Sequence, residues 1–346
     1  MSDNTIKSEQ QQQMQEIFIP ADVWLKVFAF ISPLELGLKI ALISDRFDAL
    51  VDEHFKSRKW SLGLLSIHRA TDGNGAQIVN RSGEQLPIPQ GSLPRTVVGF
   101  NHIEISYVDQ SVIEFLQRIR RLFNNSSGTT VAIHTAHDQS RSWEIIRQKI
   151  WPFVNDNICR VLLFNSSQLG HLRQFSPAIL RNCPNLRSIV SDGLFPEFPA
   201  EDNADASARQ AATKWLLTPR GDGPKMINYI FIPQEMCRLK GAFVNASEPV
   251  NFIVRLSHSA EFDVIKPFEL KNNLTRERLA LRLIGDVWLL VCCPIGREED
   301  KWAKWEEEAI GWEWSCQWNR ISIDFDDSDI GDDMDDAKAG PSEPKK

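Results

Sequence analysis

Several features are scarce in this chain of 346 residues, and each absence argues against a class of protein. No run approaches 18 consecutive apolar residues, so no segment is expected to span a membrane. Residues 1–16 are polar and rich in Gln, without the apolar stretch of a secretory signal peptide. The six cysteines include no C-x-x-C pair and are too sparse for a disulfide framework. A reducing, intracellular compartment is therefore favoured, with no choice between cytoplasm and nucleus.

Motifs for catalysis and ligand binding are also lacking: the chain has no G-x-G-x-x-G, no P-loop and no G-x-S-x-G. His134, His137 and Asp138 fall within five residues, but they follow an expected strand and lack the helical H-E-x-x-H spacing. We interpret them as a polar strand end. Cys292 and Cys293 end an apolar strand and are expected in the core on opposite faces. We therefore expect a protein without catalytic activity, metal or cofactor, while a site assembled from distant residues stays open.

Negative charge is concentrated at the carboxyl end. The net charge is −7, and residues 324–346 carry eight Asp and one Glu against three Lys. This composition predicts a disordered acidic tail. The rest of the chain is nearly neutral and has no basic stripe, so nucleic-acid binding is not expected.

One segment is unusually apolar. Residues 19–55 hold 22 Ala, Val, Ile, Leu, Phe or Trp among 37 positions, whereas the hydrophobic fraction of the whole chain is 42%. Segments below about 40 residues usually need a disulfide, a metal or a partner to be stable. This one contains no cysteine and no cluster of metal ligands. The segment is therefore expected to dock onto a partner.

Helix-start signals divide this segment into three short helices. Pro20 opens the first, Ser32-Pro33 provides an N-cap followed by proline, and Ser44 can cap the third. The residues expected on inner stripes are Val23, Trp24, Val27, Phe28, Ile31, Leu34, Leu38, Ala41, Leu42, Phe47, Leu50, Val51 and Phe55. The apolar residues outside these stripes, which a partner is expected to cover, are Leu25, Phe30, Leu36 and Ile43.

The order and spacing of these residues resemble an F-box, through Ile19-Pro20-x-Asp22-Val23, Val27-Phe28-x-Phe30-Ile31, Leu34-x-Leu36, Ala41-Leu42-Ile43-Ser44-x-Arg46-Phe47 and Leu50-Val51. Ile19 stands where that family usually has Leu, and Asp22 where Glu is common. The resemblance implies binding to a Skp-type adaptor and, through it, to a cullin and a ubiquitin-conjugating enzyme. The partner-binding residues would be Ile19, Pro20, Val23, Leu25, Phe28, Phe30, Leu34, Leu36, Ile43 and Phe47. The alternative is an amphipathic helical cap on the following domain.

Residues 101–260 alternate apolar runs with helix-like stretches. Strands are expected at Ile103–Tyr107, Thr130–His134, Arg160–Phe164, Leu186–Val190, Met226–Ile232 and Phe252–Leu256. Helices are expected at 109–123, 140–152, 168–182, 205–217 and near 234–240. This alternation implies parallel strands joined by helical crossovers. Strand starts recur about every 27 residues, which favours a solenoid of stacked repeats over an ordinary open α/β sheet.

One unit of this region carries a second resemblance. Leu169-x-x-Leu172-x-x-Phe175 is followed by Cys183-Pro184-Asn185-Leu186-Arg187-x-Ile189. This run resembles the cysteine-containing leucine-rich repeats often found behind F-boxes. Most of the chain beyond the F-box-like segment also resembles a divergent F-box family expanded in nematodes, which adds little biochemistry.

The carboxyl-terminal part has a different pattern of apolar residues. Three antiparallel strands are expected at Phe268–Leu270, Arg278–Ile284 and Val287–Cys293. Trp302, Trp305, Ala309 and Trp312 then keep helical spacing. We interpret this stretch as a capping helix, and the alternative is an aromatic surface for a target.

Taken together, the sequence predicts an α/β protein with a small amino-terminal three-helix F-box. The expected divisions are a disordered start (1–16), the F-box (17–58), an irregular connection with a hairpin (59–100), a leucine-rich-repeat-like α/β domain (101–260), an antiparallel meander with a Trp-rich helix (261–323) and the acidic tail (324–346). The expected function is substrate recognition for a Skp-cullin-F-box type ubiquitin ligase. The alternatives are an F-box scaffold that acts without a cullin and an α/β enzyme with a spatially assembled site.

Overall fold

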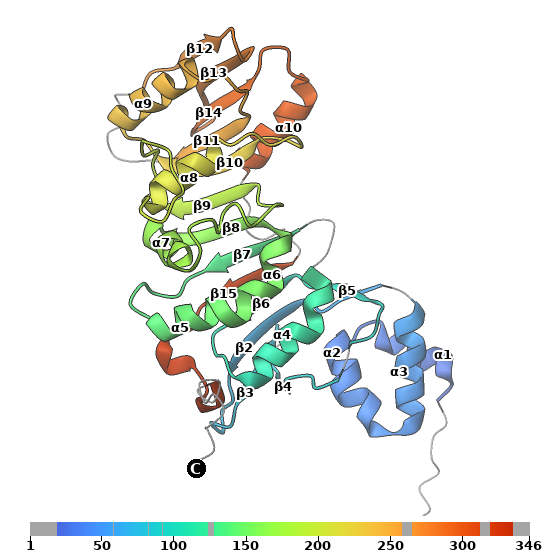
Figure 1. Cartoon of the computed structure of the whole chain (residues 1–346). Coiled ribbons are helices and arrows are strands. Elements are labelled where there is room, and N and C mark those ends of the chain that lie inside the picture. Colours follow the sequence, from blue (N-terminus) through green and yellow to red (C-terminus); the bar gives the residue numbers. More distant parts are fainter. Residues whose placement is uncertain are drawn as a thin grey trace, which may run out of the picture. The chain divides into compact units, whose positions relative to one another are not determined.

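The computed structural model describes residues 19–57, 59–81, 83–91, 93–123, 128–257, 265–311 and 319–334. The chain divides into two compact units, Met1–Arg58 and Lys59–Lys346 (Figure 1). Over the described ranges, no helix is both long enough and apolar enough to cross a membrane.

The first unit is helical. Its elements are α1 (Ala21–Phe28), α2 (Pro33–Glu35), a π-helical turn η1 (Leu36–Ile40), a 3-10 turn η2 (Ala41–Ile43) and α3 (Asp45–Ser57). Ser32 caps α2, because its Oγ accepts a hydrogen bond from the Glu35 N–H at 3.2 Å while the Glu35 carboxylate accepts one from the Ser32 N–H at 3.0 Å. The Ser44 Oγ accepts a weaker bond from the Phe47 N–H at 3.4 Å. Both caps lie where the sequence signals predicted them.

An aromatic cluster holds these helices together. Trp24 packs edge-on against Phe47 with ring centroids 4.8 Å apart, and Phe28 packs edge-on against His54 at 5.6 Å. Phe28 is fully buried, and the other buried apolar residues of this unit are Leu36, Val51 and Phe55. The core of the first unit is therefore small and largely aromatic.

The second unit is built on one large mixed sheet of thirteen described strands (Figure 1). From edge to edge these are β12 (Phe268–Asn272), β13 (Glu277–Ile284), β14 (Val287–Pro294), β11 (Phe252–Ser257), β10 (Lys225–Ile230), β9 (Ser188–Asp192), β8 (Ile158–Asn165), β7 (Thr129–Ile133), β15 (Arg320–Ile323), β6 (His102–Ile105), β2 (Leu64–Arg69), β3 (Ala76–Asn80) and β4 (Gln85–Pro87). A separate pair joins β1 (Trp60–Ser61) to β5 (Val97–Gly99).

Parallel strands form the middle of the sheet and antiparallel strands form both ends. From β2 to β11 all neighbours are parallel, whereas β3 and β4 at one end and β14, β13 and β12 at the other are antiparallel. The predicted mixed α/β class is confirmed. The hairpin expected around residues 72–75 is β2–β3, and the expected meander is β12–β13–β14.

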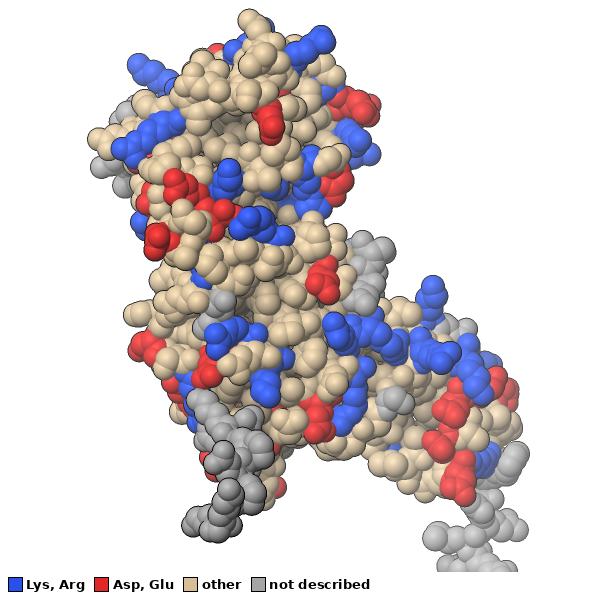
Figure 2. Space-filling view, viewed as in Figure 1, with Lys and Arg blue, Asp and Glu red and all other residues tan. Residues whose placement is uncertain are grey.

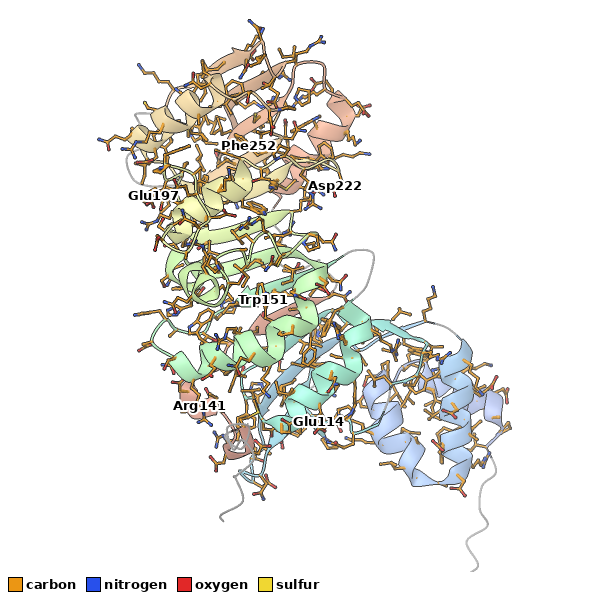
Figure 3. The ribbon with its side chains drawn as sticks, viewed as in Figure 1. Glu114, Arg141, Trp151, Glu197, Asp222 and Phe252 are labelled. Atoms are coloured by element: carbon orange, nitrogen blue, oxygen red, sulfur yellow. The ribbon has the colours of Figure 1, made fainter. Side chains whose placement is uncertain are left out.

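Helices cover the sheet unequally (Figure 1). One face carries α4 (Gln110–Phe123), α5 (Ser140–Ile145) with its continuations η3 (Ile146–Ile150) and α6 (Trp151–Val154), α7 (Ser166–Phe175), α8 (Ala208–Leu216) and α9 (Pro233–Val244). The helix expected over 168–182 ends early, at Phe175, because Pro177 disfavours a helical conformation at the residue before it. Phe252 of β11 lies fully buried in this unit (Figure 3).

The opposite face carries α10 (Glu299–Ile310). Trp302 and Ala309 of this helix pack with Ile253 of β11 and Cys293 of β14. The neighbouring Cys292 is also buried but does not belong to this cluster, since successive residues of a strand point to opposite faces. The prediction of a capping helix is therefore confirmed for Trp302 and Ala309, whereas Trp312 lies outside the described residues.

The strand β15 was not predicted. Residues 320–323 were assigned to the end of a Trp-rich capping region, yet they form a parallel strand between β6 and β7 in the middle of the sheet. Ile321 and Ile323 are fully buried there. A four-residue strand whose paired residues lie 190 positions away in β7 (Arg320 to Thr130) and 218 positions away in β6 (Arg320 to His102) leaves little local signal, because non-local pairing is set by tertiary context.

The acidic segment after β15 is ordered as far as residue 334. Phe325 and Ile330 are buried, and two 3-10 turns follow the strand, η7 (Asp327–Asp329) and η8 (Asp332–Met334). The Asp327 carboxylate accepts hydrogen bonds from the Ser142 N–H at 2.8 Å and the Ser142 hydroxyl at 2.9 Å. The prediction of a disordered tail is therefore wrong for residues 324–334, because some of its carboxylates serve as caps. Residues 335–346 and 1–16 lie outside the described residues.

Candidate partner-binding surface

Five large apolar side chains are exposed among the described residues of the first unit. Their exposed fractions are 43% for Val23, 41% for Val27, 91% for Phe30, 78% for Leu42 and 61% for Ile43. The described part of the second unit, which is several times longer, exposes seven such side chains. Exposed apolar side chains are common singly, but a concentration on a small unit is typical of an interaction surface.

Three of the five form a stripe on the first helix and the turn after it. Val23 and Val27 are four residues apart and share one side of α1, which ends at Phe28, and Phe30 lies in the turn that follows. Trp24 and Phe28 lie about 100° further round and pack into the aromatic core. Leu42 and Ile43 make a second exposed pair on η2.

The structure reverses several sequence assignments in this unit. Leu36, which is predicted to be covered by a partner, is fully buried within the unit. Val23, Val27 and Leu42, predicted to face inward, are exposed. The cause is local for Leu42: the prediction assumes regular α-helical spacing, whereas residues 36–40 form a wider π turn that rotates the residues after it. Val27 and Leu42 thus join the surface although the sequence prediction did not include them.

Phe30 and Ile43 are exposed, as predicted, and Phe28 is buried in the core. The remaining predicted partner-binding residues are Ile19, Leu25 and Phe47, which are half-buried, Pro20, which is exposed, and Leu34, whose side chain lies outside the description.

The ends of the first unit are tied together by one polar contact. The Arg46 guanidinium on α3 donates a hydrogen bond to the backbone carbonyl of Ile19 at 2.5 Å. Together with the Trp24–Phe47 contact, this bond fixes the start of α1 against α3. The stripe is therefore presented by a helix that is anchored at its start and along its inner side.

The candidate polar cluster at the end of β7 does not converge. His134 is exposed, and its backbone N–H donates to the Ile323 carbonyl at 2.8 Å. Among the described residues, no group of three or more His, Cys, Asp or Glu side chains could hold a metal ion. The segment serves as a junction with β15.

A cavity of about 170 Å³ lies beside Cys183 and Lys225. Burial raises the pKa of the Cys183 thiol to about 12, which keeps it protonated near neutral pH. Burial lowers the pKa of Lys225 to about 8, and its Nζ donates to the carbonyls of Trp215 and Thr218. Arg220 at the rim pairs with Asp222. Lys225 and Arg220 are thus each engaged with other groups, and the Cys183 thiol is kept neutral by its burial.

Charges on the visible face of the second unit are mixed. Lys and Arg side chains are interspersed with Asp and Glu (Figure 2). This arrangement provides no single-sign track for a polyanion.

Comparison of the chain with known protein families, with curated proteins and with solved structures finds no match.

Proposed function

We propose that this protein is a substrate-recognition adaptor of a Skp-cullin-F-box type ubiquitin ligase. In this proposal the first unit binds a Skp-type adaptor through its exposed apolar surface, and the second unit holds the protein to be modified. The chain carries out no bond chemistry itself. It raises the local concentration of a target lysine near a charged conjugating enzyme.

The observation that carries the proposal is the exposed apolar surface of the first unit. A segment whose sequence resembles an F-box folds as short capped helices and leaves Val23, Val27, Phe30, Leu42 and Ile43 in solvent. Burying a large apolar side chain contributes about 1.5–3 kcal/mol, so covering this surface would supply a substantial association energy. Phe30, at 91% exposure, offers the largest gain.

The order of the sheet supports a repeat-like body. Strands β6, β7, β8, β9, β10 and β11 succeed one another across the sheet in chain order, without the reversal that creates the ligand crevice of a doubly wound fold. The helices between them lie on one face (Figure 1), as right-handed crossovers moving in one direction require. This arrangement favours stacked units of the leucine-rich-repeat type, interrupted by β15 between the first two.

The proposal is tested by co-purification of the full chain with a Skp-type adaptor and a cullin, in parallel with residues 59–346 alone. We expect the full chain to recover both proteins and the truncated chain to recover neither. Recovery of the adaptor without a cullin would favour the non-ligase scaffold. Failure of the folded full chain to bind any adaptor would remove the ubiquitin-ligase proposal.

A further inference from the structure

The end of the sheet formed by β12, β13 and β14 contains a cavity of about 330 Å³. Strand alternation puts Arg278, Ala280 and Arg282 of β13 on the same face. The methyl group of Ala280 lies between the two long arginine side chains, opposite Val291 of β14 and Glu269 of β12. A short side chain between two long ones leaves a hollow with an apolar floor and charged walls.

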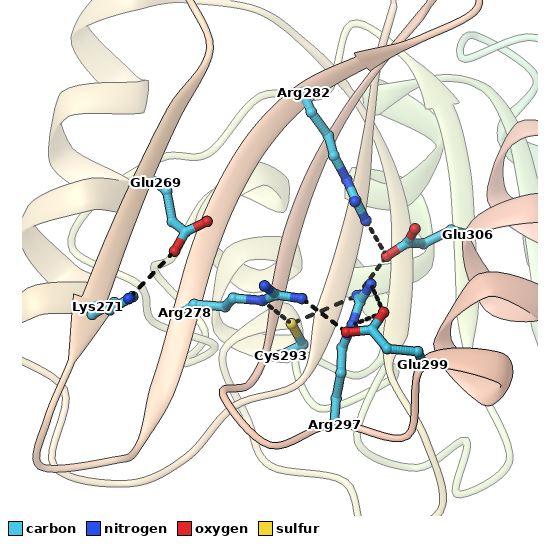
Figure 4. A network of polar contacts seen from close by, with 8 residues as sticks. All are labelled: Glu269, Lys271, Arg278, Arg282, Cys293, Arg297, Glu299 and Glu306. Atoms are coloured by element: carbon cyan, nitrogen blue, oxygen red, sulfur yellow. Dashed lines mark hydrogen bonds and ion pairs between the residues drawn. The ribbon is translucent and has the colours of Figure 1, made fainter.

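A third arginine closes one wall of this cavity. The Arg297 side chain precedes α10 and is only 4% exposed. Its Nη1 donates to the Glu306 carboxylate at 2.6 Å, and the Arg282 guanidinium reaches the same carboxylate oxygen at 2.5 Å. Figure 4 shows the three guanidinium groups converging with Glu299 and Glu306. Two arginines therefore converge on the buried carboxylate of Glu306, which is 8% exposed, while Arg278 pairs with Glu299.

The second carboxylate of the network is held in a different environment. Glu299 is 66% exposed, yet it accepts hydrogen bonds from Arg297 Nη2 at 2.6 Å, Arg297 Nε at 3.0 Å and Arg278 Nη2 at 3.3 Å. The hydrogen bond from Arg297 lowers the pKa of this carboxyl. The site thus already binds one solvent-exposed oxyanion, supplied by the chain itself.

Arg282 adds a separate observation. Its Nε is buried and has no hydrogen-bond acceptor among the described residues, although its Nη2 pairs with Glu306. Buried donors are nearly always paired, because an unpaired one is costly. This donor belongs to a residue that lines the cavity, and an oxyanion bound there would supply the missing acceptor once the Arg282 side chain turns toward it.

We propose that this cavity binds an oxyanion, a carboxylate or a phosphate, carried by an acidic or phosphorylated side chain of a protein. Naming the carrier as the target of a ligase rests on the proposed function, whereas the oxyanion site itself does not. β12 is the last strand of the sheet, so an extended segment has a strand edge beside the cavity. The apolar floor accepts the methylene groups next to the anion.

The test uses the full chain without any adaptor and isothermal titration calorimetry at constant ionic strength. The probes are inorganic phosphate and three capped peptides, Ala-Val-X-Leu-Ala, in which X is phosphoserine, Glu or Ser. We expect binding of phosphate and of at least one anionic peptide, and no binding of the Ser peptide. The stronger of the phosphoserine and Glu peptides identifies the source of the oxyanion.

Three variants separate binding from structural support. Arg282→Gln is expected to weaken binding of the anionic peptide at least about tenfold. Arg238→Gln on α9 removes an exposed arginine that is also ion-paired, with Glu235 at 3.1 Å, and should change nothing. Glu299→Gln removes the chain's own competing carboxylate and should tighten phosphate binding several-fold. A network that serves only to hold α10 in place would give no such gain.

Absence of binding by phosphate and by both anionic peptides would overturn the proposal, as would equal affinities of Arg282→Gln and Arg238→Gln. Loss of adaptor binding in the co-purification experiment would leave the oxyanion site intact and remove only the identity of its carrier.

Discussion

The two units of this chain differ in how completely they bury their apolar side chains. In the described part of the first unit, four apolar residues are buried and five large ones are exposed. In the second, the helix-covered face of the sheet is closed, with residues such as Ile105, Val131 and Ile189 fully buried. The second unit is therefore complete as a folding unit, whereas the first has apolar surface left over. On the proposed function, a partner covers this excess apolar surface and thereby stabilises the smaller unit.

The difference between the units also concerns how each is assembled along the chain. The first unit uses contacts within about 40 residues, such as Arg46 to Ile19. The sheet of the second depends on β15, which joins β6 and β7 from the far end of the chain. The body should therefore be sensitive to damage at its carboxyl end, and the helical unit should not.

The largest effect is expected from ending the chain at residue 318. Without β15, two buried isoleucines worth about 2–5 kcal/mol each are lost, and β6 and β7 lose a hydrogen-bonded neighbour. The sum is comparable to the whole stability of a typical domain, about 5–15 kcal/mol. Circular dichroism with urea should show no cooperative unfolding of the body.

The matched control ends the chain at Met334, which keeps β15, η7 and η8. This variant should unfold at the same urea concentration as the parent. Equal stability of the two truncated chains would show that β15 is dispensable.

A pair of phenylalanines separates folding from docking in the first unit. Phe28→Ala removes a fully buried ring and should cost about 3–5 kcal/mol, enough to unfold that unit. Phe30→Ala removes a ring that is 91% exposed and should leave unfolding within about 0.5 kcal/mol. On the proposed function, it should weaken adaptor binding by about 2 kcal/mol, roughly thirtyfold.

Hydrogen exchange in the two variants and titration with the adaptor measure these effects. If Phe30→Ala unfolded the unit as Phe28→Ala does, the stripe would be part of a core and not a docking surface.

A buried lysine gives the body a pH-dependent stability. The pKa of Lys225 falls from 10.5 to about 8 on folding because burial disfavours its charged form. Between pH 8 and 10.5 the unfolded chain therefore binds more protons, so this residue makes stability rise with pH. Lys225→Met removes that rise. Its stability relative to the parent should decline from pH 8 to pH 10.5, as urea midpoints would measure, and a constant difference would contradict the assignment.

The smallest effect compares two N-caps with the same chemistry. Ser32 in the first unit and Ser207 before α8 each form a capping box with the third residue of the helix. Replacing either with Ala should cost about 1 kcal/mol. The loss should measurably raise hydrogen-exchange rates in the first unit, because a small core gives that unit low stability. The exchange rates of the large body should not change measurably. Equal sensitivity of the two units would argue against this contrast.

Features of the fold that depend on neighbouring residues are predicted correctly from the sequence, whereas features that depend on distant residues are not. Alternating strands and helices, the hairpin near Asp72 and the caps at Ser32 and Ser44 depend on neighbouring residues, so the sequence displays them directly. The middle position of β15 depends on pairing across the whole chain.

For the candidate surface, residue types were easier to predict than orientations. The exposure of Phe30 and Ile43 is predicted correctly, whereas Leu36 is buried and Leu42 is exposed, Leu42 because it follows a π turn that helical periodicity does not contain. The cavity between Arg278 and Arg282 was missed because its walls come from β13 and from Arg297 before α10.

The most direct test of the central claim is calorimetric titration of a Skp-type adaptor into the double variant Phe30→Ser/Ile43→Ser. The matched control is Leu274→Ser/Ile295→Ser, which replaces two exposed apolar residues of the body. The account predicts loss of adaptor binding in the first variant, parental affinity in the second and unchanged circular dichroism in both. Parental affinity in both variants would contradict the claim that the exposed surface of the first unit is the docking site.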